Sequence, residues 1–381
     1  MIRKILYISG TRADYGLMRS VLFAIHRHPG MVLEIGVTGM HLMPEFGLTL
    51  NEIKGDGFSC HLINATFAHD SRESMALFVG DCIQGCVELI QKEKPDIILV
   101  LGDRAEMLSA TIAGTYLGIP VVHVHGGDRT STVDDIARHA ITKLSHVHCP
   151  ATRDSAERII RLGEDPRHVH VVGSPGLEEI HTGSSAGREE LASKYGIDWS
   201  RHVIIVIFHP ESFTGGDPSL QMEHVLEAAL SFQEPVRVIY PNADAGGRAI
   251  IGVIRKYEGR SDFQAYSSLP HKDYLGFLKH ASVLVGNSSS GIIEAPSFGT
   301  PAVNIGNRQQ GRIRGKNVID TGYSVDSIRN AIDTALHDRQ FRDSAKSAGN
   351  PYGDGMTSQK IARILTDLEI TPELLQKRMM Y

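Results

Sequence analysis

Charged and imidazole side chains directly follow apolar, strand-like runs at six places in this sequence. Carboxylates and imidazoles can take up and return protons, and arginine can bind phosphate through two parallel hydrogen bonds. One such place alone has a simpler explanation, since aspartate often caps a helix. Six at equivalent positions predict one shared active site. The six stretches are Thr11-Arg12-Ala13-Asp14-Tyr15; Asp103-Arg104-Ala105-Glu106; His125-Gly126-Gly127-Asp128, followed by Asp134, Asp135, Arg138 and His139; His209-Pro210-Glu211; Asn242-Ala243-Asp244-Ala245-Gly246; and Asn307-Arg308-Gln309.

One serine-rich stretch contains a candidate phosphate site. Ser282–Gly286 is typical of a buried strand, Asn287–Gly291 of a tight polar turn, and Ile292–Ala295 of the start of a helix. A helix N-terminus carries unpaired N–H groups and a partial positive charge, which suit a phosphate. The serines add hydroxyl donors, Gly291 lets a ligand approach the backbone, and Glu294 could accept from both hydroxyls of a ribose. The alternative is a serine-rich cap on an ordinary strand–helix unit.

The elements that must position these side chains form an alternating series of strands and helices, which is typical of parallel α/β sheets. The expected strands are Lys4–Gly10, Leu33–Gly39, Asp96–Gly102, Val121–His125, His146–Pro150, His168–Gly173, Val203–Phe208, Val236–Tyr240, Phe263–Tyr266, Ser282–Gly286 and Ala302–Gly306. The expected helices include Tyr15–His26, Ser74–Glu93, Ala105–Leu117 and Asp135–Leu144.

The length of 381 residues favours two domains over a single core. The boundary is expected between Gly173 and His202, because Thr182–Ser185 is polar and loop-like and a second series of strands begins at Val203. We therefore expect one Rossmann-like domain over residues 1–173 and another over residues 174–356. Ligands of doubly wound sheets lie beyond the carboxyl ends of the strands, which predicts a ligand cleft between the two domains.

Composition excludes several classes of protein. The net charge of −5 gives no general attraction to nucleic acid or to an anionic membrane. No apolar run approaches membrane-spanning length, and the opening MIRKILYISG is typical of a strand rather than of a signal peptide. Four scattered cysteines form no disulfide framework, which favours a reduced, cytoplasmic protein.

The sequence predicts neither a metal site nor a bound cofactor. It contains 19 histidines but no His-Glu-x-x-His motif. Cys82 and Cys86 are one turn apart on an apolar helix and are expected in the core. Ser9–Arg12 does not have the glycine pattern of a dinucleotide-binding turn.

The strand-end residues resemble those of the UDP-N-acetylglucosamine 2-epimerases, in particular the hydrolysing branch that feeds sialic acid-type synthesis. The order and spacing of the matching stretches extend to Gly355 and cover nearly the whole chain. The stretches are Arg12-Ala13-Asp14-Tyr15, Gly102-Asp103-Arg104, Asp134-Asp135, Arg138-His139-Ala140-Ile141-Thr142-Lys143-Leu144, His209-Pro210, Pro241-Asn242, Asp244-Ala245-Gly246, Gly286-Asn287-Ser288-Ser289, Gly299-Thr300-Pro301 and Arg308-Gln309.

This resemblance implies a glycosyltransferase-B-like fold of two Rossmann-like domains, with the C-terminal helix within 357–381 packing back on the first domain. It also implies that the second domain holds the uridine diphosphate and that the first faces the sugar. By position, the UDP-sugar would be bound by Arg12, Arg104, His209, Asn242, Ser288, Ser289, Ser290, Gly291, Glu294 and Arg308. The catalytic residues implied near the sugar and the diphosphate are Asp103, His125, Asp128, Asp134, Arg138 and His209.

The stretch at the carboxyl end of the expected strand Val121–His125 separates the branches of the family. Non-hydrolysing relatives resemble His-Val-Glu-Ala-Gly-Leu-Arg, whereas this chain has His123-Val124-His125-Gly126-Gly127-Asp128, as in the hydrolysing type. Many hydrolysing enzymes carry a glutamate in place of His125, and that glutamate is thought to handle a proton. Here the task would pass to His125 or Asp128, since histidine titrates nearer neutral pH. The change alternatively marks a different sugar, a 2,4-diacetamido-2,4,6-trideoxy sugar on the route to legionaminic acid.

The implied reaction removes the proton at C2 while the diphosphate leaves C1, and then adds water to the resulting 2-acetamidoglycal. The products are N-acetylmannosamine and UDP. Asp103 and one of His125, Asp128 or Asp134 would move the protons, and Arg12 and His209 would stabilise the leaving diphosphate without a metal. The alternatives are a non-hydrolysing epimerase, a glycosyltransferase and a sugar-nucleotide sensor. The family resemblance further implies a homodimer or homotetramer.

Overall fold

The computed structural model describes residues 2–211, 216–347 and 349–381, and it divides into two compact units. The chain passes to the second unit after Glu178 and returns to the first unit at Tyr352. A four-residue segment, Arg129–Thr132, belongs to the second unit although both of its neighbours in sequence belong to the first.

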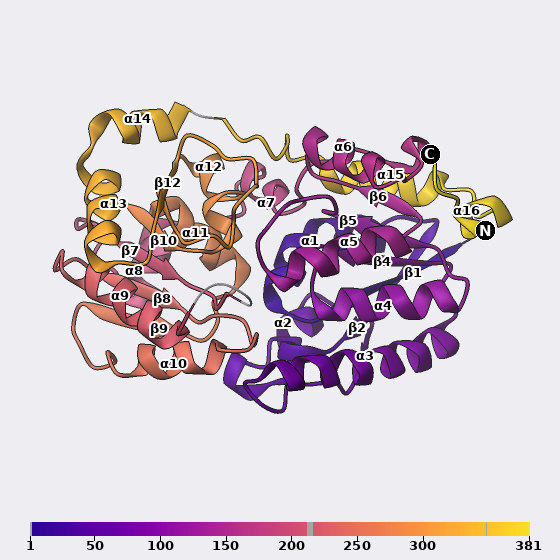
Figure 1. The fold of residues 1–381 in the computed structure, drawn as a ribbon, viewed down its shortest axis with the longest axis horizontal. Helices are drawn as coiled ribbons and strands as arrows, with labels where there is room; N and C mark the ends of the chain where they lie inside the picture. Colours follow the sequence, from indigo (N-terminus) through magenta and orange to yellow (C-terminus); the bar gives the residue numbers. More distant parts are fainter. Residues whose placement is uncertain (1, 212–215, 348) are drawn as a thin grey trace. The chain divides into compact units, whose positions relative to one another are not determined.

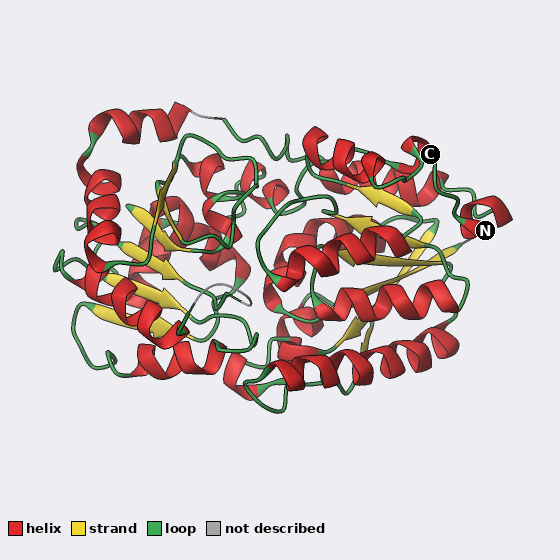
Figure 2. Cartoon of the chain, in the orientation of Figure 1, coloured by secondary structure: helices red, strands yellow, loops and turns green. Residues whose placement is uncertain are grey.

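The first unit is built on a six-stranded parallel sheet with strand order β3-β2-β1-β4-β5-β6 (Figure 1). Helices lie against the strands of this sheet (Figure 2). The strands are β1 Arg3–Ser9, β2 Met31–Val37, β3 Cys60–Leu62, β4 Ile97–Leu101, β5 Val121–Val124 and β6 Val147–Cys149. The helices are α1 Arg12–His26, α2 Leu50–Gly55, α3 Arg72–Glu93, α4 Ala105–Tyr116, α5 Val133–Leu144, α6 Arg153–Arg161, α15 Thr357–Asp367 and α16 Pro372–Gln376, with 3-10 turns η1 Gly39–Leu42, η2 Pro44–Phe46 and η3 Pro166–His168.

The second unit has its own six-stranded parallel sheet, in the order β12-β11-β10-β7-β8-β9. Its strands are β7 Ile204–Ile207, β8 Val236–Ile239, β9 Phe263–Tyr266, β10 Val283–Gly286, β11 Ala302–Ile305 and β12 Val318–Thr321. Its helices are α8 Arg188–Tyr195, α9 Pro218–Leu230, α10 Gly247–Arg255, α11 His271–His280, α12 Ala295–Phe298, α13 Val325–His337 and α14 Arg339–Ser347, with the 3-10 turn η4 Ser289–Gly291. Helix α7, Leu177–His181, contains the point where the chain passes between the units.

The central strands are apolar along their whole length because helices cover both faces of a parallel sheet. Every residue of β4 and of β7 is buried. The C-terminal helix α15 contributes Ile361 and Leu365 to the core of the first unit, where they pack with residues of β1 and α1 (Figure 1). Within the described residues, no helix is both long and apolar enough to span a bilayer.

Three predicted details of the strands are wrong. His168–Gly173 is not a strand: Asp165 caps a 3-10 turn that begins at Pro166, and only Val169 forms a bridge, to His148. Proline fixes the backbone angle that suits the first position of such a turn. The edge strands β3 and β12 were missed, because they are short and partly exposed and therefore lack a continuous apolar run.

Three histidines are buried in the first unit in their neutral form. Burial lowers the pKa of His41 and of His123 to about 3, although a backbone hydrogen bond acts in the opposite direction on each. Burial and the nearby ammonium of Lys377 lower the pKa of His146 to about 4. His146 precedes β6, and its Nδ1 accepts a hydrogen bond from the backbone N–H of Val121 at 3.1 Å.

These histidines make stability depend on pH. Below pH 6.5 the unfolded chain binds protons that the folded chain does not, so the free energy of unfolding falls as the pH falls. Each buried histidine should remove about 2 kcal/mol between neutral pH and pH 5. His146→Asn keeps an acceptor near the position of Nδ1 but does not titrate. We expect this variant to gain about 2 kcal/mol relative to wild type over that range.

Denaturant unfolding of both proteins at pH 7.5 and pH 5 measures this difference. The matched control is His337→Asn, at an exposed histidine of α13. A difference between wild type and His146→Asn that stays constant with pH would contradict the assignment of His146 as a neutral, buried group.

Candidate functional site

A buried arginine organises the candidate site of the first unit. Arg138 of α5 is 1% exposed, and its guanidinium donates to the Asp103 carboxylate, to the Asp128 carbonyl at 3.0 Å and to the Asp135 carboxylate at 3.1 Å. Burial by itself would lower the pKa of Arg138, but the carboxylates of Asp103, Asp128 and Asp135 raise it above its ordinary value. One cation therefore joins the carboxyl end of β4, the turn after β5 and the first turn of α5.

A second buried side chain, His123, fixes the backbone just before Asp103. It follows Gly102, whose carbonyl oxygen lies 2.7 Å from His123 Nε2, while Nδ1 of His123 lies 3.2 Å from the Thr142 hydroxyl. His123 thus links β5, α5 and the end of β4. The Asp103 side chain is 22% exposed, so it is held by a buried arginine and still reaches solvent.

His125 and Asp128 form an imidazole–carboxylate pair at the end of β5. His125 Nδ1 lies 3.4 Å from Asp128 Oδ2, and the other carboxylate oxygen of Asp128 accepts from the Ser155 hydroxyl at 2.7 Å. The His125 ring stacks on Tyr352, with centroids 6.2 Å apart and ring planes at 12°. His125 has φ +64°, a left-handed conformation that is strained for a residue with a side chain and is often found at functional sites.

The glycines between His125 and Asp128 are required by the space around them. A Cβ on Gly126 would lie 2.7 Å from His123 Nδ1, and one on Gly127 would lie 2.4 Å from the Ser155 carbonyl oxygen. Gly127 also has φ +80°. The chain can therefore bring His125 and Asp128 together only with small residues at these two positions.

Arg12 follows β1 and Arg104 follows β4, and these two strands are neighbours in the sheet. Arg104 pairs with the fully buried Glu106 at 3.2 Å, and burial raises the pKa of that carboxyl while Arg104 lowers it. Arg12 begins α1, and its side chain is half-buried. Asp14 has a structural role: it accepts from the Ser9 hydroxyl and the Thr11 backbone N–H, both at 2.6 Å, and completes a capping box with Thr11.

In the second unit an asparagine holds His209. The Asn287 side chain accepts from the His209 backbone N–H at 2.7 Å and donates to the His209 carbonyl at 2.8 Å. His209 Nδ1 accepts from the backbone N–H of Asn242 at 3.2 Å. This places the proton of the neutral ring on Nε2. His209 is therefore suited to donate a hydrogen bond to an anion.

The segment after β10 differs from the helix that the sequence predicted. Its first turn is the 3-10 turn η4, and α12 is only four residues long. Glu294 does not lie one turn inside a helix: it is the residue before α12 and is 3% exposed. Pro296 and Gly299 restrict the helix to one turn. No long helix therefore points its dipole at a ligand here. The hydroxyl and backbone N–H groups of the turn are the candidate phosphate donors.

Two side chains of the loop after β11 bind the Asn287 carbonyl, and the serines of the η4 turn make further hydrogen bonds. Gln309 Nε2 donates to the Asn287 carbonyl at 2.8 Å, and an Arg308 guanidinium N–H donates to the same oxygen at 3.3 Å. Ser290 accepts from the Tyr274 hydroxyl, and its backbone N–H donates to the Ser288 hydroxyl at 3.3 Å. Ser289 and Gly291 complete η4.

Each unit thus joins part of the predicted residue set. The first unit joins Asp103, His125, Asp128 and Arg138, with Asp134 in the first turn of the helix that carries Arg138. The second unit joins His209 and Arg308 through Asn287, and Asn242 contacts His209. Sequence reasoning did not select the supporting residues Asp135, Tyr352, Asn287 and Gln309 as site residues. Asn287 could have been found from its place directly after β10, whereas nothing local marks Tyr352.

Comparison with known proteins decides the family. A sequence profile described as UDP-N-acetylglucosamine 2-epimerase matches residues 23–366. The chain belongs to this family, and to its hydrolysing branch. Over 378 residues, covering 99% of both chains, it is 42% identical to the hydrolysing UDP-N,N'-diacetylbacillosamine 2-epimerase of Legionella pneumophila. It is 34% identical to a UDP-N-acetylglucosamine 2-epimerase of Neisseria meningitidis over 380 residues, 99% of this chain and 98% of that one.

The epimerase fold also matches that of solved family members. A crystal structure of the UDP-GlcNAc 2-epimerase from Neisseria meningitidis bound to UDP-GlcNAc aligns with a TM-score of 0.80 and covers 96% of this chain and 100% of that one. The sequence identity of that alignment is 18%, so the likeness concerns the fold. Two Rossmann-like units of the glycosyltransferase-B-like type are therefore shown for this epimerase, as the sequence predicted.

The contacts of Arg138 lead to a prediction for the epimerase. Arg138→Lys keeps the charge, but a single ammonium cannot reach acceptors on three elements at once. Misplacement of Asp103 by a fraction of an ångström should lower kcat about 10²-fold, whereas UDP affinity should stay within about threefold. Turnover and UDP titration measure the two effects. Arg167→Lys, at an exposed arginine paired with Asp165, is the control. A kcat close to wild type in Arg138→Lys would show that turnover does not depend on the three contacts of the guanidinium.

Proposed function

We propose that the chain is a hydrolysing 2-epimerase that converts a UDP-linked 2-acetamido sugar into the free manno-configured sugar and UDP. The observation that carries the proposal is the His125–Asp128 pair beside Asp103, held in the first unit by the buried Arg138. Carboxylates of this kind near a diphosphate oppose binding, so a protein that only binds sugar nucleotides gains nothing from them. Proton transfer at the sugar gives them a use.

The proposed reaction has two stages. A base removes the C2 proton, the C2–H electrons form the C1–C2 double bond, and the bond from C1 to the diphosphate oxygen breaks in an anti elimination. Water then adds its hydroxyl to C1 of the 2-acetamidoglycal, and a proton returns to C2 on the opposite face. Atoms balance, since the sugar gains one water and UDP leaves with the bonding electrons. The C2 proton is weakly acidic, so stabilisation of the leaving diphosphate must drive the first stage.

We assign the proton transfers to the first unit. With Nδ1 facing the Asp128 carboxylate, His125 has Nε2 available to exchange a proton, as in other carboxylate–histidine pairs. Asp103, fixed by Arg138 and partly exposed, is the second acid–base group, and Asp134 is the reserve candidate on α5. General acid–base groups of this kind typically contribute about 10²–10⁴-fold each.

We assign the nucleotide mainly to the second unit. His209 donates from Nε2 and Arg308 from its guanidinium to the diphosphate, with hydroxyl and backbone donors from the η4 turn. Glu294 is proposed to accept from the ribose. The remaining proposed contacts come from Asn242, Ser288, Ser289, Ser290 and Gly291 in the second unit and from Arg12 and Arg104 in the first.

The sugar is the finer part of the proposal. The chain is 42% identical to an enzyme named for UDP-N,N'-diacetylbacillosamine and 34% identical to one named for UDP-N-acetylglucosamine. This difference supports UDP-2,4-diacetamido-2,4,6-trideoxyglucose as the preferred substrate, with His125 as the residue that departs from the glutamate common in other hydrolysing enzymes. UDP-N-acetylglucosamine, giving N-acetylmannosamine for sialic acid-type synthesis, is the second candidate.

A proton NMR time course in deuterated water tests reaction and substrate together, with the two UDP-sugars in parallel. We expect free manno-configured sugar carrying deuterium at C2, with release of UDP, and a larger kcat/KM for the diacetamido substrate. A manno product still linked to UDP would contradict hydrolysis. Faster turnover of UDP-N-acetylglucosamine would reverse the substrate assignment, and turnover of neither substrate would contradict the proposed function.

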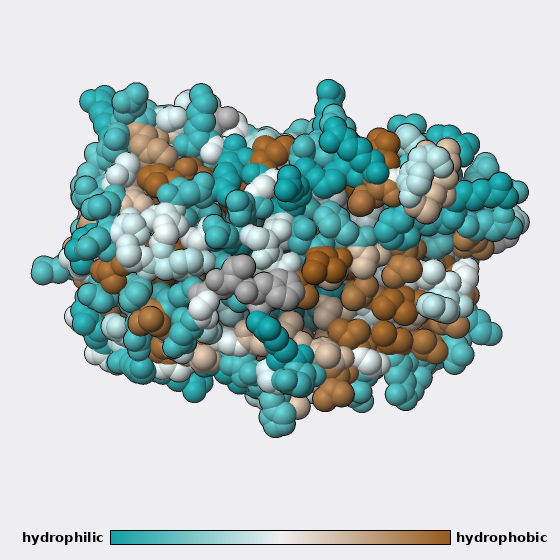
Figure 3. Space-filling view, in the orientation of Figure 1, coloured by the Kyte–Doolittle hydropathy of each residue, from teal (hydrophilic) through white to brown (hydrophobic). Residues whose placement is uncertain are grey.

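We also propose that the enzyme is a cytoplasmic homo-oligomer. The four cysteines, all among the described residues, are free thiols, which favours a reducing compartment. Apolar side chains gather over α3 and α4 (Figure 3), and Leu77 is 70% and Tyr116 is 87% exposed. Contiguous apolar patches mark interaction surfaces, and a two-fold dimer pairs the same patch on both subunits. The apolar face of α3 then serves both core and interface.

Leu77→Asp tests this assembly. A buried, unpaired carboxylate at a subunit interface is strongly unfavourable, so the variant should have the mass of a monomer at concentrations where the wild type is a dimer or larger. Size-exclusion chromatography with light scattering measures the mass. Leu220→Asp, at an exposed leucine of α9, should leave it unchanged. A monomeric wild type, or an oligomeric Leu77→Asp, would contradict the interface.

A further inference from the structure

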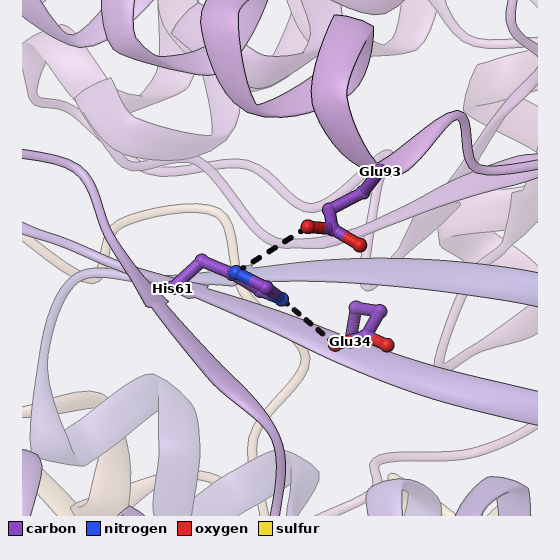
Figure 4. Close-up of side chains that lie close together, drawn as sticks. All are labelled: Glu34, His61 and Glu93. Atoms are coloured by element: carbon purple, nitrogen blue, oxygen red, sulfur yellow. Dashed lines mark hydrogen bonds and ion pairs between the residues drawn. The ribbon is translucent and has the colours of Figure 1, made fainter.

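Three side chains that the proposed chemistry does not use converge at one edge of the first unit. They are Glu34 on β2, His61 on the edge strand β3, and Glu93, the last residue of α3 (Figure 4). His61 Nε2 lies 2.8 Å from Glu34 Oε2, and His61 Nδ1 lies 3.6 Å from Glu93 Oε1. One nitrogen of His61 and one oxygen from each glutamate lie within 4.8 Å of one another.

Strand register brings the first two residues together. β2 and β3 run parallel, and His61 lies opposite Gly36 of β2. Since side chains two residues apart on a strand share a face, Glu34 is on the same face as Gly36 and next to His61. The His61 and Glu34 side chains are 19% and 14% exposed, so the pair is neither fully buried nor freely solvated.

Glu93 lies beside this pair although its position at the end of α3 is unfavourable for a carboxylate. A carboxylate in the last turn of a helix faces the negative end of the helix dipole. A second carboxylate, Glu34, stands across the His61 ring from it. Two carboxylates and a helix C-terminus at one place create a negative potential that a cation would stabilise.

The cations already present cover only part of this charge. Lys4 Nζ lies 3.4 Å from Glu93 Oε2, and Lys92, whose side chain is 71% exposed, lies 3.5 Å from Oε1. Among the described residues, Glu93 Oε1 is paired with the His61 imidazole and with the exposed Lys92.

We propose that Glu34, His61 and Glu93 form a binding site for a divalent transition-metal ion of the zinc class. One imidazole nitrogen with two carboxylate oxygens is a ligand set that zinc accepts, whereas magnesium and calcium prefer oxygen alone. The two short contacts use different nitrogens of His61, whereas one ion takes only one of them. One nitrogen and one oxygen of each glutamate lie within 4.8 Å of one another, and side-chain rotation would bring them to the about 2.0–2.2 Å at which zinc binds nitrogen and oxygen. Water would complete the coordination.

The surroundings allow an ion to enter. His61 also lines an open hollow of about 580 Å³, together with Cys60, Asp81, Glu88 and Lys92. Glu34 lies opposite Leu6 in the middle of β1, and Glu93 ends the helix before β4, whereas the candidate catalytic residues follow the carboxyl ends of the strands. The metal would therefore join an edge strand and a helix end to β2, as a structural site rather than a catalytic one.

Calorimetric titration of the chelator-treated full-length protein with Zn²⁺ tests the proposal. We expect one equivalent bound at this site, a rise in Tm on addition of Zn²⁺, and no comparable effect of Mg²⁺. Glu34→Gln, His61→Gln and Glu93→Gln each remove one ligand and should weaken binding about tenfold or more. Asp333→Asn is the matched control, because Asp333 and His337 form an exposed carboxylate–histidine pair at 3.0 Å on α13.

Co²⁺ provides a readout that does not require the variants to fold. A site of low coordination number with one nitrogen and two oxygen ligands should give a saturable visible absorption band in the wild type, and Zn²⁺ should abolish it. No saturable binding of either ion, or equal affinity in wild type and the three ligand variants, would overturn the site. The cluster would then be an ion-pair network in which His61 bridges two glutamates.

Discussion

The buried guanidinium of Arg138 is the interaction on which the first unit's candidate site depends. A cation that is 1% exposed is costly unless anions and carbonyls surround it. Asp103, Asp128 and Asp135 supply these partners from three different elements. Because the charge must be matched, the ends of β4 and β5 and the start of α5 have one favourable arrangement. That arrangement positions the proposed acid–base groups before any substrate arrives, which is the condition for efficient proton transfer.

In the second unit, amide side chains rather than a buried charge hold the candidate site residues in place. Asn287 uses its side chain to bind both backbone groups of His209 and its carbonyl to accept from Arg308 and Gln309. A site for an anion benefits from donors that are fixed and positively polarised but not cancelled by nearby carboxylates. In the first unit a buried guanidinium fixes carboxylates beside an imidazole, and in the second unit an amide fixes an imidazole and a guanidinium.

Strain and close packing mark the same turn in the first unit. His125 adopts a left-handed backbone, and the two glycines after it have no space for a side chain. Such a turn is stable only because its surroundings fix it: Tyr352 stacks on the His125 ring, and Ser155 binds Asp128. Tyr352 is the first residue of the returning C-terminal segment. The C-terminal segment therefore contributes to the candidate site as well as to the core of the first unit.

The sequence by itself determined the fold class, most central strands and the family. Continuous apolar runs and the polar residues directly after them are local features, so β4, β7, Asp103 and His209 could be identified without coordinates. The tertiary structure decided what no local pattern contains: the short helix after Ser288, the edge strands, and partners distant in sequence, such as Tyr352 for His125 or the meeting of Glu34, His61 and Glu93. The physical reason is that packing and charge pairing act between residues adjacent in space, whatever their separation along the chain.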